Sequence, residues 1–466
     1  MKRFALREHS SSILVATLGA AFGVALLLGV GALTTMIAAD DVTGSSDTVA
    51  FLIGVVAWVF ISIAIYVSAV VTANTFATII AGRTRTIALL RLIGASASDQ
   101  RKAVAREGFI VGGIGAILGS VIGTGLVAAT LSILAAQQVV PSLSYRYLDP
   151  VVLLPIAAVV LTTWLASWVG SRRVLTVSPM QATGAAQELT LEQSTSRKSR
   201  NATAITLFAA GIGILLLGVA VGLVSPLGVL VGMVGGLLSF TGLVLGAHLV
   251  MPPALRLVGR MFGSSASAKL AAENAVRYPE RSSRTTIGLV IGITLVTMFA
   301  VAISSYQTII YGAQEADPVY YAGINQMMLI TVIVFSVLTG FSALIAAVGM
   351  VNNLSLSVLQ RTRELGLLRA LGFTAKQVRR MILVESAQLV TASVLVGLVL
   401  GVFYGWAGAQ SLLGSINAGP GLILPTVPLA LVGVIVVAAV VLTIAASTTP
   451  ARRATRVAPV VALAVD

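Results

Sequence analysis

The 466-residue sequence contains no cysteine and only two histidines, His9 and His248. Without cysteine the chain can form neither disulfide bonds nor thiolate metal sites, and two histidines are too few for a histidine cluster. Charged residues are also scarce, at 10% of the chain, whereas 57% of the residues are hydrophobic and the mean hydropathy is +1.00. These values lie far from those of soluble domains. The composition therefore predicts a polytopic membrane protein.

A phosphate-binding loop is also missing from the sequence. Such a loop places Lys and then Ser or Thr directly after a glycine-rich turn. The chain has five lysines, none of which stands in that context: Lys2, Lys102, Lys198, Lys269 and Lys376. We therefore expect no ATP hydrolysis, no cofactor and no metal site on this chain.

Ten apolar stretches are long enough to cross a bilayer as a helix, which takes about 20 residues. They lie roughly at 12–38, 50–80, 108–136, 150–170, 203–224, 227–250, 285–305, 326–351, 382–413 and 426–447. With the N-terminus inside, 29 of the 30 basic residues fall on the inner side, and Arg146 is the exception. Lys and Arg gather in cytosolic loops, so we expect both termini to be cytosolic. The net charge of +14 is then a topology signal and does not indicate a nucleic-acid partner.

The sequence is internally duplicated. Residues 83–107 and 361–385, which lie 278 positions apart, share ten identical residues in 25. Further matches are Asn74 with Asn352, Gly119 and Gly123 with Gly397 and Gly401, and Arg172, Arg173 and Pro179 with Arg452, Arg453 and Pro459. The duplication predicts two four-span repeats, 1–186 and 266–466, joined by a cytosolic linker at 187–201 and a linking pair of spans at 202–265. The predicted fold is an all-α membrane protein of about ten transmembrane helices, in which the two four-helix repeats run parallel.

Small residues four positions apart recur in corresponding spans. Because lipid gives helices no hydrophobic reason to associate, such spacings favour close packing of helix backbones. The third span of each repeat carries Gly119 with Gly123 and Gly397 with Gly401, and the first spans carry Gly19 with Gly23 and Gly288 with Gly292. We expect helix packing at these glycines.

Each repeated stretch predicts a bent element on the inner side, which we call the elbow (residues 83–107 in the first repeat and 361–385 in the second). In the second elbow, Leu365, Leu368 and Leu371 are spaced by three and predict one side of a short helix. Gly372 then predicts a helix stop, because glycine readily adopts a positive φ.

A new helix is predicted to start directly after each stop. Thr374 and Gln377 have the spacing of a capping box, and Ser96 and Asp99 stand at the equivalent positions of the first elbow. Each elbow is therefore predicted to be a short helix, a break and a basic helix that runs into the membrane.

Glu107 and Glu385 occupy matched positions where the elbows enter the membrane. A carboxylate is costly there unless it is paired or lies near water. We expect interfacial ion pairs with a loop arginine such as Arg83 or Arg361. A proton relay is the alternative.

The segment from Asn352 to Glu385, centred on 361–372, resembles the permease domain of FtsX-like ABC transporters. This superfamily includes the MacB-type exporters and the ten-span permeases of bacitracin-type peptide resistance. The resemblance is specific over spans seven to ten and weaker over spans one to four. Ten-span members usually carry a large extracellular domain between spans seven and eight, where this chain has only residues 305–325.

In this family the loop matching each elbow is the coupling helix that docks on the nucleotide-binding subunit. The resemblance implies that role for Arg83, Arg85, Leu89, Leu90, Arg91 and Gly94 in the first elbow and for Arg361, Arg363, Glu364, Leu367, Leu368, Arg369 and Gly372 in the second. Glu364 and Arg369 are expected to face solvent. The first elbow departs by having Thr86 and Ala88 where the second has Glu364 and Gly366.

The resemblance implies the permease subunit of an ATP-driven transporter in a bacterial cytoplasmic membrane. It would export or extract an amphipathic or hydrophobic substrate such as an antimicrobial peptide, a drug or a lipid-like molecule. ATP and magnesium would belong to a separate ATPase, and two elbows on one chain predict one permease that holds two ATPase copies within the membrane lipid. The alternatives are a proton-coupled secondary transporter that uses Glu107 and Glu385, or an ATP-driven signalling or scaffold complex that acts on envelope enzymes. The elbows could also merely anchor basic residues to anionic headgroups.

Overall fold

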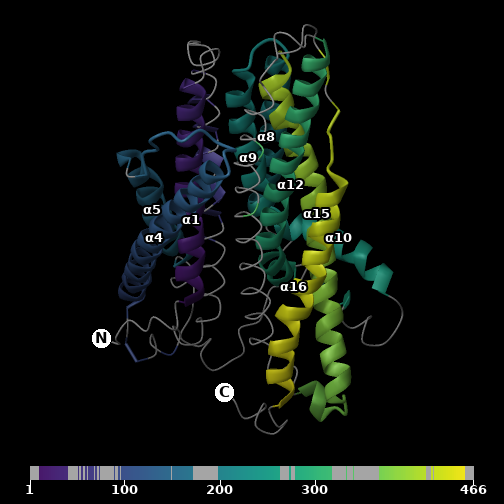
Figure 1. Cartoon of the computed structure of the whole chain (residues 1–466). Helices are drawn as coiled ribbons and strands as arrows, with labels where there is room; N and C mark the ends of the chain where they lie inside the picture. Colours follow the sequence, from purple (N-terminus) through teal and green to yellow (C-terminus); the bar gives the residue numbers. More distant parts are fainter. Residues whose placement is uncertain are drawn as a thin grey trace.

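The computed structural model describes residues 10–39, 96–147, 149–171, 198–262, 279–316, 367–415 and 424–456, with shorter pieces between 51 and 94, within 272–276, at 332, 340 and 421–422. Every regular element in these residues is helical (Figure 1). The α-helices are α1 (Ser10–Ala38), α4 (Ala97–Ala136), α5 (Leu153–Gly170), α8 (Lys198–Gly222), α9 (Gly228–Leu245), α10 (Ala247–Gly259), α12 (Pro279–Ala316), α15 (Ala375–Leu413) and α16 (Leu429–Arg456). Short 3₁₀ turns, η1 (Pro150–Val152) and η3 (Arg260–Phe262), precede α5 and follow α10.

Seven of the described helices are long and apolar enough to cross a membrane. They are α1, α4, α5, α8, α9, α12 and α15, which coincide with the first, the third to seventh and the ninth predicted spans. The tenth corresponds to α16, and the predicted spans at 50–80 and 326–351 lie largely outside the described residues. The all-α polytopic fold is thus confirmed, whereas the total of ten spans stays a prediction. One boundary differs, because α8 already begins at Lys198, inside the predicted linker at 187–201.

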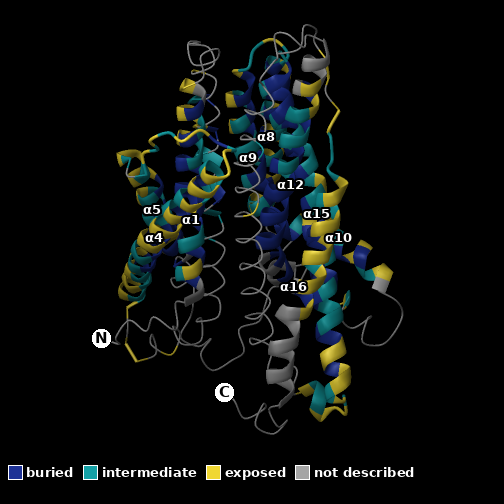
Figure 2. Ribbon diagram, viewed as in Figure 1, coloured by how far each residue is buried: buried dark blue, intermediate teal, exposed yellow. Residues whose placement is uncertain are grey.

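The helices form two groups with a hairpin between them. α1, α4 and α5 pack together on one side, α12, α15 and α16 on the other, and α8 and α9 lie between the groups and contact α15 (Figure 1). The first helix of each group is the most enclosed: 72% of the spanning window of α1 and 83% of that of α12 are buried, against 22% for α4 (Figure 2). Each group is therefore built around its first helix.

The two longest helices occupy equivalent places in the groups. α4 has 40 residues and α15 has 39, so at 1.5 Å per residue each is about 60 Å long, twice the thickness of a hydrocarbon core. Both begin at the lower end of the molecule in Figure 1. Each helix consequently extends past the bilayer, and the two elbows lie at the same end.

A seam of small residues joins α4 to α1. A Cβ atom added to Gly119 would lie 2.6 Å from the Cβ of Ala20, and one added to Gly123 would lie 2.7 Å from the carbonyl oxygen of Ala21. Contact this close requires that neither glycine carry a side chain. On α1 itself Gly23 faces Pro155 near the start of α5, at 3.1 Å from an added Cβ, so this glycine serves a different neighbour from the α4 seam.

The second group repeats this seam in the same register. A Cβ on Gly397 would lie 2.8 Å from the Cβ of Ile293 in α12, and one on Gly401 would lie 2.8 Å from the carbonyl oxygen of Thr294. Gly397 thus meets α12 at Ile293 as Gly119 meets α1 at Ala20, and the next turn matches as well. The duplication therefore extends to the way the first and third helices of each repeat pack.

The α8–α9 hairpin is also held by glycines. An added Cβ on Gly218 would meet the backbone of Gly232, and one on Gly222 would lie 2.6 Å from the carbonyl oxygen of Ser411 in α15. Beyond α9, α10 contains Pro252 and packs against α12 and α15. The linking pair is thereby fixed to the second group.

Candidate functional site

The described part of the second elbow starts with one helical turn at 367–370, which a left-handed glycine ends. Gly372 has a φ of +98°. Its N–H donates to the carbonyl oxygen of Arg369 at 3.1 Å, and the N–H of Phe373 donates to that of Leu368 at 3.1 Å. This pair of bonds is the Schellman motif, which satisfies carbonyl groups that a helix end leaves open. The predicted helix stop is confirmed.

The helix after each stop starts at a side-chain cap. The N–H of Gln377 donates to the Thr374 hydroxyl at 3.2 Å and the N–H of Thr374 donates to the side chain of Gln377 at 2.8 Å, so the predicted capping box is confirmed. In the first elbow Gly94 has a φ of +99° and the Ser96 hydroxyl accepts from the N–H of Asp99 at 3.0 Å. The Asp99 carboxylate accepts from the Ser96 hydroxyl at 2.7 Å. Only half of the box forms there.

A small apolar cluster, which we call the elbow core, fixes the second elbow to α15. Val378, Met381 and Ile382 are buried, and Leu368 and Phe373 from the elbow pack against them. Each fully buried side chain of this size contributes about 1.5–3 kcal/mol. The described turn of the short helix is therefore packed against α15.

The first elbow lacks three of the five apolar side chains of this core, although Leu368 and Ile382 have apolar equivalents in Leu90 and Val104. Offset by 278 positions, Val378 and Met381 correspond to Gln100 and Ala103, and Phe373 corresponds to Ala95. Ala103 is exposed and Gln100 is partly exposed. The two elbows therefore share their backbone bend but differ at three of the five core positions.

Both elbows expose the same pair of apolar residues. Leu89 and Ile93 are 48% and 81% exposed, and the matching Leu367 and Leu371 are 52% and 72% exposed. The N–H of Ile93 donates to Leu89 at 3.2 Å and that of Leu371 to Leu367 at 2.9 Å, so each pair is separated by one helical turn and shares a side. The matched pairs form two equivalent apolar surfaces at one end of the molecule.

The predicted leucine stripe of the second elbow needs a correction. Leu368 packs against the elbow core, whereas Leu371 is exposed and lies one turn after Leu367. Leu365 lies outside the described residues. Arg369, which was expected to face solvent, is partly buried. Seven predicted coupling residues lie outside the described residues: Arg83, Arg85, Leu90, Arg91, Arg361, Arg363 and Glu364.

Glu107 and Glu385 are both partly buried, one on α4 and one on α15. The arginines predicted to pair with them, Arg83 and Arg361, lie outside the described residues, so these ion pairs stay a prediction. His248 is buried and its Nε2 lies 2.8 Å from the side-chain oxygen of Asn201, which fixes the start of α8 to that of α10.

A polar bridge between the groups was missed by the sequence analysis. The hydroxyls of Tyr66 and Thr241 lie 2.7 Å apart, and those of Ser239 and Tyr404 lie 2.9 Å apart. The ring of Phe240 stands edge-on to both tyrosines. The bridge links a helical piece of the first repeat, α9 and α15. Tyrosines in the middle of apolar stretches were the available signal, because polar groups in a membrane need partners.

A cavity of about 110 Å³ adjoins this bridge. Its wall is mostly apolar, with hydroxyl groups from the bridge. The lining residues come from both repeats and the linking pair: Val59, Ile63, Tyr66, Val67, Leu215, Val229, Gly232, Met233, Gly236, Leu237, Phe240, Thr294, Leu295, Met298, Tyr404, Gly408 and Ser411. The cavity therefore lies at the junction of the three parts of the chain.

Comparison with known proteins matches both repeats. The family described as FtsX-like permease C-terminal matches residues 58–179 and 336–459. Two proteins of Bacillus subtilis (strain 168) are similar to parts of the chain. The uncharacterized ABC transporter permease YknZ is 34% identical over 102 residues, which is 22% of this chain and 24% of YknZ. The ABC transporter permease YtrF is 34% identical over 65 residues, which is 14% of this chain and 15% of YtrF.

The chain thus matches only about a quarter and a seventh of the lengths of these two relatives, whereas the family match covers more than half of the chain. The family match occurs twice, once on each repeat, and the two matches start 278 positions apart, as the two elbows do. Each match contains the third helix, the glycine seam and the elbow that have just been described. The chain belongs to the FtsX-like permease family.

Proposed function

We propose that this protein is the permease subunit of an ABC transporter in a bacterial cytoplasmic membrane. In this proposal the elbow end of the molecule is cytosolic, and each elbow docks one copy of a separate nucleotide-binding ATPase. The observation that carries the proposal is the pair of apolar surfaces formed by Leu89 with Ile93 and by Leu367 with Leu371.

Exposed leucines are common singly on protein surfaces and need no explanation. Here, however, two apolar side chains one turn apart are exposed at matched positions of both repeats, at the end where the long helices leave the membrane. Burial of apolar side chains at the centre of an interface is a usual source of binding energy between proteins. Two like surfaces on one chain suit two copies of one partner, as the ATPase pair of an ABC transporter requires.

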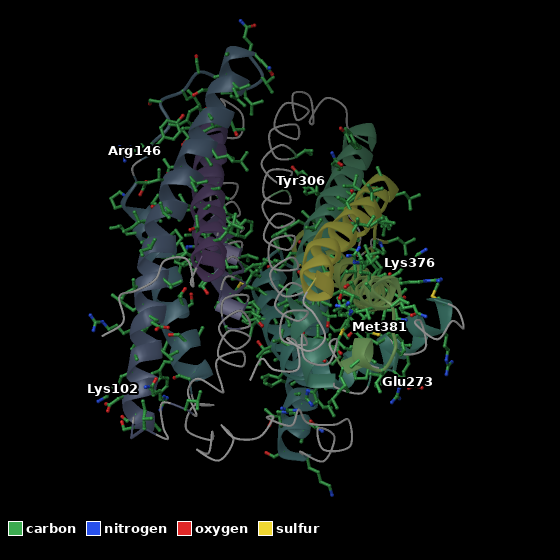
Figure 3. The ribbon with its side chains drawn as sticks, turned by 90° about the horizontal axis from the view of Figure 1, so that it is seen from below. Lys102, Arg146, Glu273, Tyr306, Lys376 and Met381 are labelled. Atoms are coloured by element: carbon green, nitrogen blue, oxygen red, sulfur yellow. The ribbon has the colours of Figure 1, made fainter. Side chains whose placement is uncertain are left out.

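The packing suggests how the motion would be passed on. The elbow core packs the described turn of the second elbow against α15, and α15 contacts α12 along the glycine seam. Movement of the elbow would thus tilt α15 against α12, and α4 would move against α1 in the same way. Lys102 and Lys376, near the starts of α4 and α15, lie well apart in Figure 3. Closure of an ATPase pair on binding ATP would draw these starts together.

The junction cavity supports an amphipathic or hydrophobic substrate. Its wall offers apolar side chains with a few hydroxyls, which suits a molecule with a large apolar part and hydrogen-bonding groups. At about 110 Å³ it is smaller than a drug-sized ligand site, which is on the order of 300–1,000 Å³. The cavity would therefore have to widen during transport, as the tilting of α15 would allow. The printed names of YknZ and YtrF, both ABC transporter permeases, also support the proposal.

Cysteine cross-linking tests the docking surface, because the chain has no cysteine of its own. Ile93→Cys and Leu371→Cys, each in the otherwise unchanged chain, are coupled to a photoreactive maleimide in native membranes. Leu424→Cys is the matched control, since Leu424 is 83% exposed and follows the opposite end of α15. The cross-linked product is then labelled with 8-azido-ATP.

We expect an ATP-labelled cross-link from Ile93→Cys and from Leu371→Cys and none from Leu424→Cys. Cross-links without nucleotide label, or equal labelling at Leu424→Cys, would contradict the docking of an ATPase at the elbows.

A further inference from the structure

A basic groove lies beside the start of α4 and is distinct from the apolar docking pair. It has a volume of about 720 Å³ and is open to the surface. α4 and the end of α5 line it with Ser98, Arg101, Lys102, Ala105, Arg106, Phe109, Leu161, Trp164 and Trp168. Three of these side chains are cationic, and no acidic residue is among them. The groove therefore favours an anion.

Arg101 is held in place with donors to spare. Its guanidinium carbon lies 4.1 Å from the centre of the Trp168 ring, which is a cation–π contact. The Nε and Nη2 atoms of Arg101 are buried and have no hydrogen-bond partner among the described residues. A buried donor without a partner is unfavourable, and oxygen atoms of a phosphate match the guanidinium fork. The geometry thus leaves Arg101 ready for an oxyanion.

The groove also has an apolar side. Phe109 and Leu161 are 55% and 54% exposed. Phe109 lies farther from the start of α4 than the three cations, and Leu161 lies farther from the end of α5 than the two tryptophans. Trp164 and Trp168 line the groove near the end of α5. Tryptophan is enriched where a helix passes from hydrocarbon to water. The groove therefore offers cations toward the water and apolar side chains toward the bilayer.

The second repeat does not repeat this arrangement. Arg101 and Lys102 correspond to Arg379 and Arg380, but Arg106 corresponds to Val384. The aromatic residues are absent too: Phe109, Trp164 and Trp168 correspond to Ala387, Ile444 and Thr448. A feature confined to one copy of a duplicated chain is not explained by the function that the copies share. Docking of the ATPase, or a general attraction to headgroups, would explain the basic pair that both copies share. Neither explains the residues that are present only in the first copy.

We propose that this groove binds the headgroup phosphate of one anionic phospholipid from the inner leaflet. Arg101, Lys102 and Arg106 contact the phosphate, Trp168 holds the Arg101 guanidinium in place, and an acyl chain runs along Phe109 and Leu161. The bound lipid supplies the first elbow with the fixed support that the elbow core gives to the second.

Native mass spectrometry of the full chain in detergent tests the proposal, with dioleoyl phosphatidylglycerol as the probe and dioleoyl phosphatidylcholine as the neutral comparison. The variant is Arg101→Gln with Arg106→Gln. Its matched control is Arg379→Gln with Arg380→Gln, which removes the same charge from the second repeat.

We expect the unchanged chain to retain one phosphatidylglycerol with an affinity at least about tenfold higher than the groove variant, since charge-assisted bonds to phosphate are lost. The control should bind like the unchanged chain, and phosphatidylcholine should not be retained. Glycerol phosphate, the soluble headgroup, should not displace the lipid. Equal binding by the groove variant, an equal loss in the control, or displacement by glycerol phosphate would overturn the lipid site.

A second measurement leaves the groove itself unchanged, in case the charge variant fails to fold. Trp58→Phe with Trp406→Phe leaves Trp164 and Trp168 as the tryptophans of the chain. Phosphatidylglycerol brominated near the headgroup end of its acyl chains should quench their fluorescence saturably and more strongly than brominated phosphatidylcholine. Equal quenching by the two lipids would contradict the proposal.

Discussion

Replacing Gly119 by Ala should separate α4 from α1. The added methyl group would lie 2.6 Å from the Cβ of Ala20 and 2.8 Å from the backbone nitrogen of Ala21, whereas carbon atoms pack best at about 3.5–4.0 Å. α1 is enclosed and the contact includes its backbone, so the helices must move apart by about 1 Å. Overpacking of this kind costs about 1–3 kcal/mol.

Gly125→Ala is the matched control on the same helix. Gly125 has nothing within 4 Å of an added Cβ, so this change brings only the helix propensity of alanine, a gain of up to about 1 kcal/mol. The difference between the two variants therefore isolates the seam. It should amount to a few kcal/mol in favour of Gly125→Ala.

Thermal unfolding in detergent, followed by the fluorescence of the four tryptophans, measures this difference. We expect the midpoint of Gly119→Ala to fall several degrees below that of the unchanged chain and that of Gly125→Ala to stay equal or rise. Equal midpoints for the two variants would refute the argument that the seam is closely packed.

Three further changes test other parts of the structure. Gly401→Ala should lower the same midpoint, because its Cβ would lie 2.8 Å from the carbonyl oxygen of Thr294, whereas Gly408→Ala meets nothing within 4 Å and should not; equal effects would count against a second seam. Gly372→Ala should destabilise the elbow by about 1 kcal/mol, since φ is +98° there, and hydrogen–deuterium exchange of residues 367–374 should quicken; unchanged exchange would speak against a strained turn. Tyr404→Phe removes the hydroxyl contact to α9 at 2.9 Å and should cost about 1 kcal/mol in thermal unfolding; an unchanged midpoint would show that the polar bridge contributes nothing.

The local features of the elbows could be predicted from the sequence. A helix stop at Gly372 and a cap at Thr374 depend on residues within a few positions of one another, so their spacing is sufficient. The apolar spans follow from composition in the same way. The glycines of the seams could be picked out because they recur at matched positions of a duplicated chain.

Contacts between distant segments could not be predicted in this way. The spacing of Gly19 and Gly23 does not say that Gly23 faces the start of α5 while other residues of α1 meet α4. The leucine stripe was wrong because a spacing of three does not say which leucine meets α15: Leu368 packs against the elbow core, whereas Leu371 is exposed. The basic groove and the polar bridge need Trp168 beside Arg101 and Tyr404 beside Ser239, and these pairs are far apart in the sequence.

The two elbows differ in their elbow-core residues, and this difference can be found by aligning the copies. The structure is needed to show that these residues form a core. Aligning the copies places Gln100 and Ala103 opposite Val378 and Met381. Their importance follows from the burial of the second pair in the elbow core. Once that core is known, the alignment shows that the first elbow replaces three of its five apolar side chains.

Native mass spectrometry of the complex with its ATPase, without nucleotide, tests the central claim most directly. Ile93→Asp and Leu371→Asp each place a charge in one apolar docking pair and leave the other unchanged. The account predicts two bound ATPase copies on the unchanged chain, one on each single variant and none on the double variant. An ATPase that remains bound to the double variant would contradict the claim that the two elbows are the docking sites.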